Sequence, residues 1–544
     1  MFDLLHESFA RHGDSFFLRK DRGVLIVPEA FLKNEYEEIQ KNEQFLYEEG
    51  QKVFEVAKQN VLENAGSEVC HSLSLTQDLP NETLLLTEKT TVTLSNIEIS
   101  AKLFFVLLEK TKITIGERFS ITKHVDNEDC IRDHDMAREA PFYLSGGVVS
   151  RLALENIERM PPSSIGCSLK EIRLYRTGLI NIFSKLRINK DSEVKCIGLS
   201  AREKENVAAI LPKDHLIYIG GVKRLFLENY AVSVLPKLRI HEGHELKLLK
   251  LAATEEEYVA TILAQDHPFC VGRVKEMEFW DYAVFVFLKI KEVGEGPEGL
   301  LLSIYGDGLW KKIHEELGNE STTICIEEVE KLVLKEHAVN ILPTLKIKEE
   351  MDTFSLDANN EEQVSEVLSE EYKGISFGRI KDFGLFGSAV NLLPKIRLGE
   401  DSEVEQYSLF AAEKRQISNV LGKEDRSIST GRVKNMELTG YAVCVIPKLR
   451  IHEDNIMERF LVSTNELYFS RILSEGDSSI EVGKIRQVDF RVTKKLKRKL
   501  RYTLVDGEGN EVHEEKNGEG SEAVGREVNE VLEERSCQRR NHLD

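Results

Sequence analysis

Apolar residues recur along most of the chain in a short pattern, two apolar positions separated by one other residue. In the turn that begins near Val222 these positions are Leu225 and Leu227, and in a later turn they are Met436 and Leu438. Such spacing places two side chains on the same face of a β-strand. The pattern therefore predicts a series of short strands, each with one face in a core.

Thirteen consecutive turns follow this pattern, and the steps between them alternate between about 24 and about 28 residues. Two turns make a unit of about 52 residues, which is also visible in the blocks YAVSVLPKLRI, AVNILPTLKI, AVNLLPKIRL and YAVCVIPKLRI. Self-similarity at such periods indicates a solenoid, whose turns pack only against their neighbours. The first apolar positions of the turns are Leu169, Val194, Val222, Leu246, Val274, Gly299, Val329, Met351, Ile380, Val404, Val433, Met457 and Ile485.

The rest of each turn must return the chain to the start of the next strand. In the short turns we expect an extended Leu-Pro-Lys-Leu-Arg-Ile segment. In the long turns we expect a helix, as over 254–265 and 464–473, because each of these segments opens with a capping residue and an early acid. Helices are bulkier than strands, so the sheet should line the inner side of an arc. The predicted fold is an α/β solenoid with a parallel concave sheet, and with helices and extended segments on the convex side.

Over roughly residues 70–492 the apolar ladder resembles the leucine-rich-repeat family, whose consensus is L-x-x-L-x-L-x-x-N-x-L. The alternation of short and long turns is similar to that of ribonuclease-inhibitor-type horseshoes, although both turns are shorter here. The resemblance implies a horseshoe that binds proteins on its concave face and has no catalysis of its own. One departure is the consensus asparagine, present only at Asn359 and Asn465. The hydrogen bonds along the inner turn must therefore differ from those of the family.

Less regular segments precede the regular repeats of 169–492. Residues 1–68 are expected to form a helical N-terminal cap, and a coiled coil is the alternative, because Leu32, Ile39, Leu46 and Val53 recur every seven residues. Residues 69–168 are expected to hold short irregular repeats, with a loop insertion at about 122–145. The strand cores expected there are Leu73/Leu75, Val92/Leu94, Ile113/Ile115 and Leu152/Leu154.

After the last repeat, residues 493–544 are expected to form a basic cap segment and an acidic, mobile tail. The basic run KKLKRKLR at 494–501 resembles a nuclear-localisation signal. Leu496 and Leu500 within it fit an element that closes the solenoid, and we favour that interpretation because terminal repeats need covering.

Composition narrows the class of protein. The hydrophobic share of 41% and the charged share of 31% are typical of a soluble globular protein. The net charge of −20 argues against a nucleic-acid surface, which is normally basic. No apolar run reaches the roughly 20 residues of a membrane-spanning helix, and no secretory signal is evident. The eight scattered cysteines fit reduced thiols. We expect a cytoplasmic protein, or a nuclear one if 494–501 acts as a signal.

The residues between and just after the paired apolar positions should face the concave side, and large aromatic residues are enriched among them. Five of six come one place after the second apolar position of their turn. Exposed aromatic residues on a rigid sheet suit binding hot spots, although stacking of Trp280 on Tyr305 would also serve stability alone. Acidic and basic residues are mixed among them. The predicted partner-binding residues are Tyr175, Phe226, Glu228, Glu278, Trp280, Tyr305, Asp357, Phe386 and Phe410.

Basic pairs recur once per double turn and form a second ladder. They could bind an acidic ligand or phosphates. Because an acid follows within a few residues in most copies, we favour pairing within the chain on a solvated face. The pairs are Lys185/Arg187, Lys237/Arg239, Lys289/Lys291, Lys346/Lys348, Lys395/Arg397 and Lys448/Arg450.

No catalytic motif stands out in the sequence. There is no GxxxxGK[ST], HExxH or GxSxG pattern, and no Cys/His cluster at metal-ligand spacing. The sequence predicts a non-catalytic scaffold that binds a protein partner, with no cofactor, metal or small-molecule substrate evident. Two alternatives remain open: a GTPase-activating protein of the Ran type that acts through the repeat edge, and a phosphatase-regulator-like horseshoe.

Overall fold

The computed structural model describes residues 8–31, 33–34, 69–134, 140–146, 149–211, 216–240, 244–265, 268–291, 296–318, 324–326, 328–369, 374–400, 402–464 and 468–512. The seven-residue repeat from Leu32 to Val53, the consensus Asn465 and the acidic tail beyond 512 lie outside these residues. The chain divides into two compact units. Unit 1 comprises Met1–Val274 and Phe285–Gly294, and unit 2 comprises Lys275–Val284 and Glu295–Asp544.

Fourteen strands form one parallel sheet, and their order in the sheet is their order in the sequence. From β13 onward each predicted turn contributes one strand, so the predicted α/β solenoid-like arrangement is confirmed. In unit 1 the strands are β11 (Phe142–Gly146), β13 (Leu169–Tyr175), β16 (Cys196–Ala201), β19 (Arg224–Asn229) and β21 (Glu245–Ala253). In unit 2, which holds most of β23, they are β23 (Arg273–Asp281), β25 (Gly299–Ile304), β27 (Lys331–Glu336), β29 (Glu350–Ala358), β31 (Arg379–Gly387), β33 (Glu403–Ala411), β35 (Arg432–Gly440), β38 (Arg459–Ser463) and β40 (Phe490–Arg491).

The predicted alternation of buried and exposed positions holds in these strands. In β19, Leu225 and Leu227 are buried, whereas Phe226 and Glu228 are partly exposed. In unit 2, Phe354, Phe383 and Tyr407 stack on one another in the core, with ring centroids 6.3 and 5.0 Å apart. One face of the sheet therefore covers the core. We call the other face, formed by the residues that alternate with the buried ones, the open face.

The short turns return through 3-10 helices, not through the extended segments that we expected. The reason is that YAVSVLP is apolar almost throughout, and the structure buries Ala231 to Pro236 against the turns on both sides. Extended backbone is limited to two or three residues after each helix. These helices are η2 (Gly178–Lys185), η4 (Tyr230–Lys237), η6 (His337–Thr344), η8 (Ser388–Lys395) and η10 (Tyr441–Lys448), with α7 (Ala283–Phe287) in the equivalent place.

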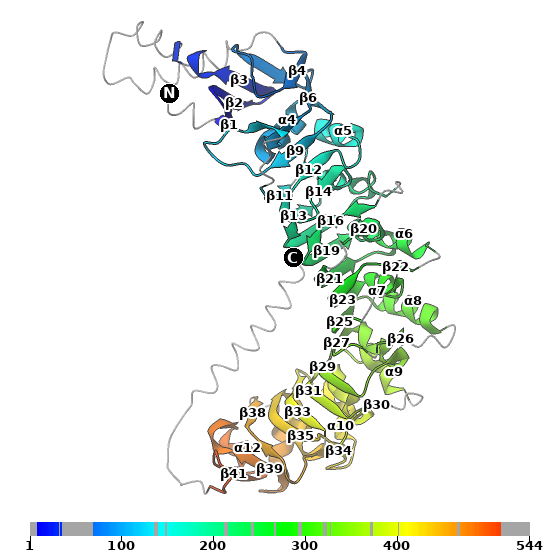
Figure 1. Ribbon diagram of the computed structural model, residues 1–544. Helices are drawn as coiled ribbons and strands as arrows, with labels where there is room; N and C mark the ends of the chain where they lie inside the picture. Colours follow the sequence, from blue (N-terminus) through cyan, green and yellow to red (C-terminus); the bar gives the residue numbers. More distant parts are fainter. Residues whose placement is uncertain are drawn as a thin grey trace, which may run out of the picture. The chain divides into compact units, whose positions relative to one another are not determined.

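The long turns return through short helices, which lie on one side of the strands in Figure 1. The helix expected over 254–265 is present as a 3-10 turn followed by one α-helical turn, and the one expected over 464–473 is present at its C-terminal end. The helices are η3 (Lys204–Asn206), η5 (Glu256–Tyr258) with α6 (Ala260–Leu263), α8 (Asp307–Gly318), η7 (Glu362–Val364) with α9 (Ser365–Leu368), η9 (Lys414–Ile417) with α10 (Ser418–Leu421), and α11 (Ser470–Leu473).

Short parallel sheets join the return segments of successive turns. The pairs are β15 (Glu193–Val194) with β18 (Gly221–Val222), β17 (Ile217–Tyr218) with β20 (Leu238–Arg239), β22 (Phe269–Cys270) with β24 (Ile290–Lys291), β26 (Ile324–Cys325) with β28 (Leu345–Lys346), β30 (Ile375–Phe377) with β32 (Ile396–Leu398), and β34 (Ile428–Ser429) with β36 (Leu449–Arg450).

The first residues described form antiparallel strands, although we expected a helical cap over 1–68. β1 (Ser8–His12), β2 (Ser15–Lys20) and β3 (Gly23–Pro28) pair in succession, and β5 (Leu84–Thr87) adds to β3. Two-residue connections at Gly13–Asp14 and Asp21–Arg22 join them, and alternate apolar residues such as Phe16, Leu18, Leu25 and Val27 build a small core. Turn residues between alternating apolar runs favour hairpins over a helix.

The irregular repeats of 69–168 are partly as expected. β4 (Ser72–Leu75), β6 (Thr91–Leu94) and β8 (Lys112–Ile115) pair in parallel and contain the three expected strand cores. Leu152 and Leu154 belong instead to helix α5 (Arg151–Arg159), whose N-cap Ser150 accepts a hydrogen bond from the Ala153 N–H. The expected loop insertion contains β10 (Ile131–Asp133) and ends in β11. The other elements are β7 (Ile97–Ser100), α4 (Ala101–Lys110), β9 (Phe119–Thr122), β12 (Ile165–Cys167) and β14 (Leu186–Ile188).

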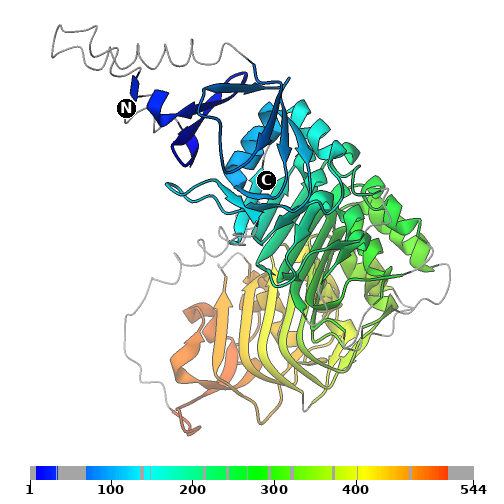
Figure 2. The same ribbon diagram turned by 45° about the horizontal axis from the view of Figure 1, so that its top comes forward.

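The basic run at the C-terminal end folds as a closing element of unit 2. It forms α12 (Lys494–Lys497) and the start of β41 (Leu500–Val505), which pairs with β39 (Ile480–Arg486) and, through it, β37 (Ile456–Met457). Leu496 and Leu500 are buried, as the cap interpretation requires. In the described part of the chain, no helix is long and apolar enough to cross a membrane. Figure 2 shows the parallel strands of unit 2 from a second direction.

Candidate interaction surface

All nine residues predicted to bind a partner lie on or beside the open face, and each is at least partly exposed. Tyr175, Phe226 and Glu228 belong to unit 1. The other six belong to unit 2, which therefore carries most of the candidate surface.

In unit 2 the strand register aligns most of these residues in one row, which we call the Trp280 row. Its members, one from each strand of β23 to β33, are directly paired across neighbouring strands. Tyr305 is not a member, although its spacing suggested the same position as Trp280. It lies two residues beyond Ser303, just past the end of β25. The row consists of Trp280, Ser303, Lys335, Asp357, Phe386 and Phe410.

Trp280 and Tyr305 stack on each other, as the sequence suggested. Their ring centroids are 5.9 Å apart and their planes differ by 18°. The ammonium of Lys335 lies 5.7 Å from the Trp280 ring centroid, within the range of a cation–π contact. Tyr305 is nevertheless 49% exposed. The two rings therefore form a pre-assembled aromatic surface that loses little side-chain entropy when a partner covers it.

Asp281 fixes the backbone at this stack. Its Oδ1 accepts a hydrogen bond of 2.8 Å from the Tyr305 N–H. Burial raises the pKa of Asp281, and the hydrogen bond from Tyr305 opposes that shift. Burial also raises the pKa of the Tyr305 phenol. Asp281 has a φ of 54°, a conformation that non-glycine residues rarely adopt. The contact with Tyr305 gives a reason for a side chain at this strained position.

Phe386 and Phe410 form a second aromatic pair in the Trp280 row, directly opposite each other on β31 and β33. The Phe386 ring lies over Gly384 of its own strand, where a Cβ atom would come within 2.8 Å of the ring. The glycine thus leaves room for the ring to lie close to the sheet. Asp357 precedes this pair in the row.

In unit 1 the exposed Tyr175 makes a similar contact. Its hydroxyl group would lie 2.8 Å from a Cβ atom at Gly198 on the neighbouring strand. Burial raises the pKa of Tyr175. The register pairs Gly198 with Phe226, and Ser200 with both Tyr175 and Glu228. Tyr175 and Glu228 therefore share a row, while Phe226 lies one row away.

The open face is mixed in charge, as predicted, and several of its charged groups pair with each other. Lys331 Nζ lies 4.0 Å from Glu276 Oε1 across the sheet. Arg173 pairs with Glu171 on its own strand. The Lys331–Glu276 pair is exposed, so it contributes little to stability.

The basic ladder shows part of the intramolecular pairing that we expected, since Arg450 lies 3.4 Å from Glu400, and it also has a structural role that we did not predict. Its first lysines reach back to the end of the preceding helix: Lys185 Nζ donates to the carbonyl oxygen of Met160 (2.6 Å) and Lys395 Nζ to that of Ser369 (2.9 Å). Both acceptors are helix C-caps, where cations are favourable. Lys289 and Lys448 similarly contact Gln265 O and Asp425 Oδ1. The acids that follow each pair in the sequence are not the partners of these four lysines.

A ladder of asparagines was missed by the sequence analysis. Asn391 Nδ2 donates to Arg415 O (3.0 Å), and its Oδ1 accepts from Asn419 N–H (2.9 Å) in the next turn. Asn340 and Asn181 make the equivalent pair of hydrogen bonds. The signal was present, since AVN opens two of the recurring blocks. These asparagines occupy a different position from the consensus asparagine, and they satisfy backbone groups that join one turn to the next.

Neither a metal site nor a disulfide occurs in the described residues: no group of three or more His, Cys, Asp or Glu side chains is placed to hold an ion, and the cysteines described are unpaired. Cys130, Cys167, Cys196 and Cys444 are buried. No family model, no curated protein and no solved structure matches the chain.

Proposed function

We propose that this chain is a non-catalytic scaffold of the leucine-rich-repeat type, cytoplasmic, which binds a partner protein on the open face of its sheet. The observation that carries the proposal is the Trp280–Tyr305 stack. It presents aromatic area on regular strands, with Tyr305 half exposed and backbone geometry fixed by Asp281.

The physical reasoning concerns how binding free energy is distributed over an interface. Large aromatic side chains held in place before binding are enriched among hot spots, because they bury much area at low entropic cost. The open face of unit 2 supplies two such groups, Trp280 with Tyr305 and Phe386 with Phe410. The charged residues between them would set orientation and association rate more than affinity.

The test is co-purification of the tagged full chain from a lysate, with chemical crosslinking to locate contacts. Partners crosslinked near β23–β33 are tested again with Trp280→Ala and Phe386→Ala. If the proposal is correct, each variant should weaken the purified pair at least tenfold, the effect of a hot spot of more than about 1.4 kcal/mol.

Tyr218→Ala provides a matched control. Tyr218 is 61% exposed but lies on the short strand β17, outside the fourteen-stranded sheet. Its replacement should leave binding unchanged. Binding that survives both open-face substitutions, in chains with unaltered circular dichroism, would contradict the proposed surface. Faster GTP hydrolysis by a small GTPase in the presence of the chain would contradict the non-catalytic part.

A further inference from the structure

A basic hollow lies in unit 2 among the return helices of the long turns, away from the open face. It has a volume of about 490 Å³ and is lined by Lys414 and Arg415 of η9, Arg471 of α11, and three residues of the α10 segment, Ser418, Leu421 and Gly422. All three charged residues in the lining are cations, in a chain whose net charge is −20. The positive charge of this lining is therefore a local feature, because the chain as a whole is acidic.

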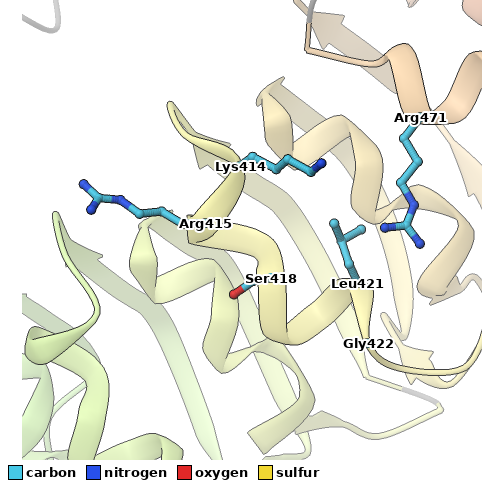
Figure 3. A pocket seen from close by; sticks show the side chains of 6 residues that line it. All are labelled: Lys414, Arg415, Ser418, Leu421, Gly422 and Arg471. Atoms are coloured by element: carbon cyan, nitrogen blue, oxygen red, sulfur yellow. The ribbon is translucent and has the colours of Figure 1, made fainter.

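Figure 3 shows that two of the three cations face the hollow. The Lys414 ammonium and the Arg471 guanidinium extend toward the space above Leu421, whereas Arg415 points away. Arg415 Nε pairs with Glu413 Oε2 at 2.6 Å. Within the described residues, neither Lys414 nor Arg471 has a carboxylate partner within 4 Å. Their charges are therefore available to a ligand, and that of Arg415 is already engaged.

The repeat itself supplies a comparison for this site. Lys414 and Arg415 occupy the place held by Glu256 and Glu257 in one long turn, and by Glu361 and Glu362 in another. The fold therefore accepts glutamate at this position, so Lys414 is not required to form the turn. Lys204 holds the same place in a long turn of unit 1, so this helix start accepts either charge.

A buried thiol lies within electrostatic range of both cations. Both Lys414 and Arg471 act electrostatically on Cys444, whose pKa burial raises and the two cations lower. Cys444 belongs to η10 and occupies the position of the ladder asparagine there, with its Sγ 3.2 Å from Tyr468 O. Two cations from turns about 55 residues apart in the sequence thus act on one point.

We propose that this hollow is a binding site for a phosphate group, held between Lys414 and Arg471. The phosphate of a phosphorylated side chain carries a charge of about −1.5 to −2 at pH 7, which matches two cations, whereas a carboxylate matches only one. Its three terminal oxygens accept hydrogen bonds from the lysine ammonium and the planar arginine fork at the same time. The site lies apart from the open face, so it stands or falls independently of the function proposed above.

The test is fluorescence anisotropy with the full chain and a labelled alanine–glycine peptide that carries one phosphothreonine. We expect binding at least tenfold tighter than that of the unphosphorylated twin and of a twin with glutamate in its place. Lys414→Glu, which installs the residue that other turns carry, and Arg471→Gln should each weaken binding at least tenfold. Lys414→Arg should retain it within about threefold.

Arg415→Gln is the matched control. It removes one positive charge from the residue next to Lys414, and the Arg415 side chain points away from the hollow. Binding of the phosphopeptide should then remain within about twofold. If Arg415→Gln weakens binding as much as Lys414→Glu does, the attraction is unspecific and the proposed site is wrong. Equal binding of the phosphopeptide and the glutamate peptide would also overturn the site. So would unchanged binding by the Lys414→Glu variant, provided that its melting temperature equals that of the wild type. Competition by inorganic phosphate at equal concentration would assign the site to free phosphate, and competition by phosphopeptide alone would assign it to a modified chain.

Discussion

The residue at the end of the sheet strand in each short turn has a positive φ, and its side chain differs from turn to turn. It is Asp281 or Glu336 in two turns of unit 2, with φ of 54° and 56°, and Gly387 or Gly440 in two others, with φ of 65° and 64°. At Gly440 a Cβ atom would lie 2.2 Å from the Ala411 carbonyl oxygen. The lack of space therefore requires glycine at Gly440, and the backbone conformation also favours it.

Gly440→Ala should destabilise unit 2 by more than about 2 kcal/mol, because the new Cβ atom meets backbone that cannot move independently. Urea unfolding of the full chain measures the change. The control is Gly422→Ala, at a helix end with φ of −73° and no neighbour closer than 3.6 Å. There we expect a change of less than about 1 kcal/mol. Similar losses in the two variants would contradict this explanation.

Sequence reasoning did not find this glycine position, and the cause is visible in the repeat. The same position holds Arg176, Asn229, Asp281 or Glu336 in other copies. A shared backbone conformation is hidden when the residues that adopt it do not share a side chain. Asp281 shows one use of a non-glycine residue at this position, since its carboxylate accepts a hydrogen bond from the Tyr305 N–H.

Among the elements, the short return helices depend on contacts with neighbouring turns. A helix of four residues such as α9 is unstable alone, because most of its carbonyl groups have no partner within the helix. Lys395 supplies one such partner at the C-cap Ser369, from the next 3-10 helix. The lysine ladder therefore joins elements that would not form separately.

Lys395→Met, which keeps most of the apolar stem and removes the donor, should destabilise unit 2 by about 1–2 kcal/mol. Lys434→Met is the comparison, because Lys434 forms only an exposed pair of 3.9 Å with Glu405. Its loss should change the unfolding free energy by less than about 0.5 kcal/mol. Thermal melts of the two variants measure the difference. A melting temperature of Lys395→Met that is no lower than that of Lys434→Met would contradict the capping role.

Strands were the elements that the sequence predicted well, because a period of two is a direct consequence of strand geometry. The return segments were harder. In η4 all the residues from Ala231 to Pro236 are buried, so this segment shows no apolar period. The N-terminal strands were missed because the expectation of a helix, based on residues after 28, was extended over the whole of 1–68.

For the molecule as a whole, the last described element closes the end of unit 2. Leu496 and Leu500 fill the space that a further turn would occupy. Lys499 and Arg501 of the same segment pair with Asp477 and Glu481 of the turn before. The basic run thus adds both apolar and charged contacts to the end of the solenoid.

Leu496→Asp should expose the end of unit 2 and lower its stability by about 3 kcal/mol or more, since it buries a carboxylate in an apolar site. The exposed sheet edge should also favour association between copies. Lys494→Asp, at an exposed position two residues earlier, should cause neither effect. Light scattering measures the association between copies, and the melting temperature measures the loss of stability. A monomeric, wild-type-like Leu496→Asp chain would contradict the cap.

The candidate surface could be predicted in part from the sequence, whereas the hollow could not. Which residues face outward follows from alternation, and all nine predicted residues do so. Which of them meet depends on strand register, which placed Tyr305 outside the Trp280 row. The hollow joins Lys414 to Arg471 across two turns. Such a juxtaposition is invisible in a linear sequence.

The two ladders also constrain how such a chain can lengthen during evolution. The short turn that contains η8 is tied backward by Lys395 and forward by Asn391. A single inserted turn would place two short or two long turns side by side, and the lysine or asparagine hydrogen bonds to one neighbour would lose their acceptors. Duplication of a short turn together with a long turn keeps both sets of hydrogen bonds. The gene is therefore expected to have grown by copying pairs of turns, which accounts for blocks that resemble each other most strongly at about 52 residues rather than at half that distance.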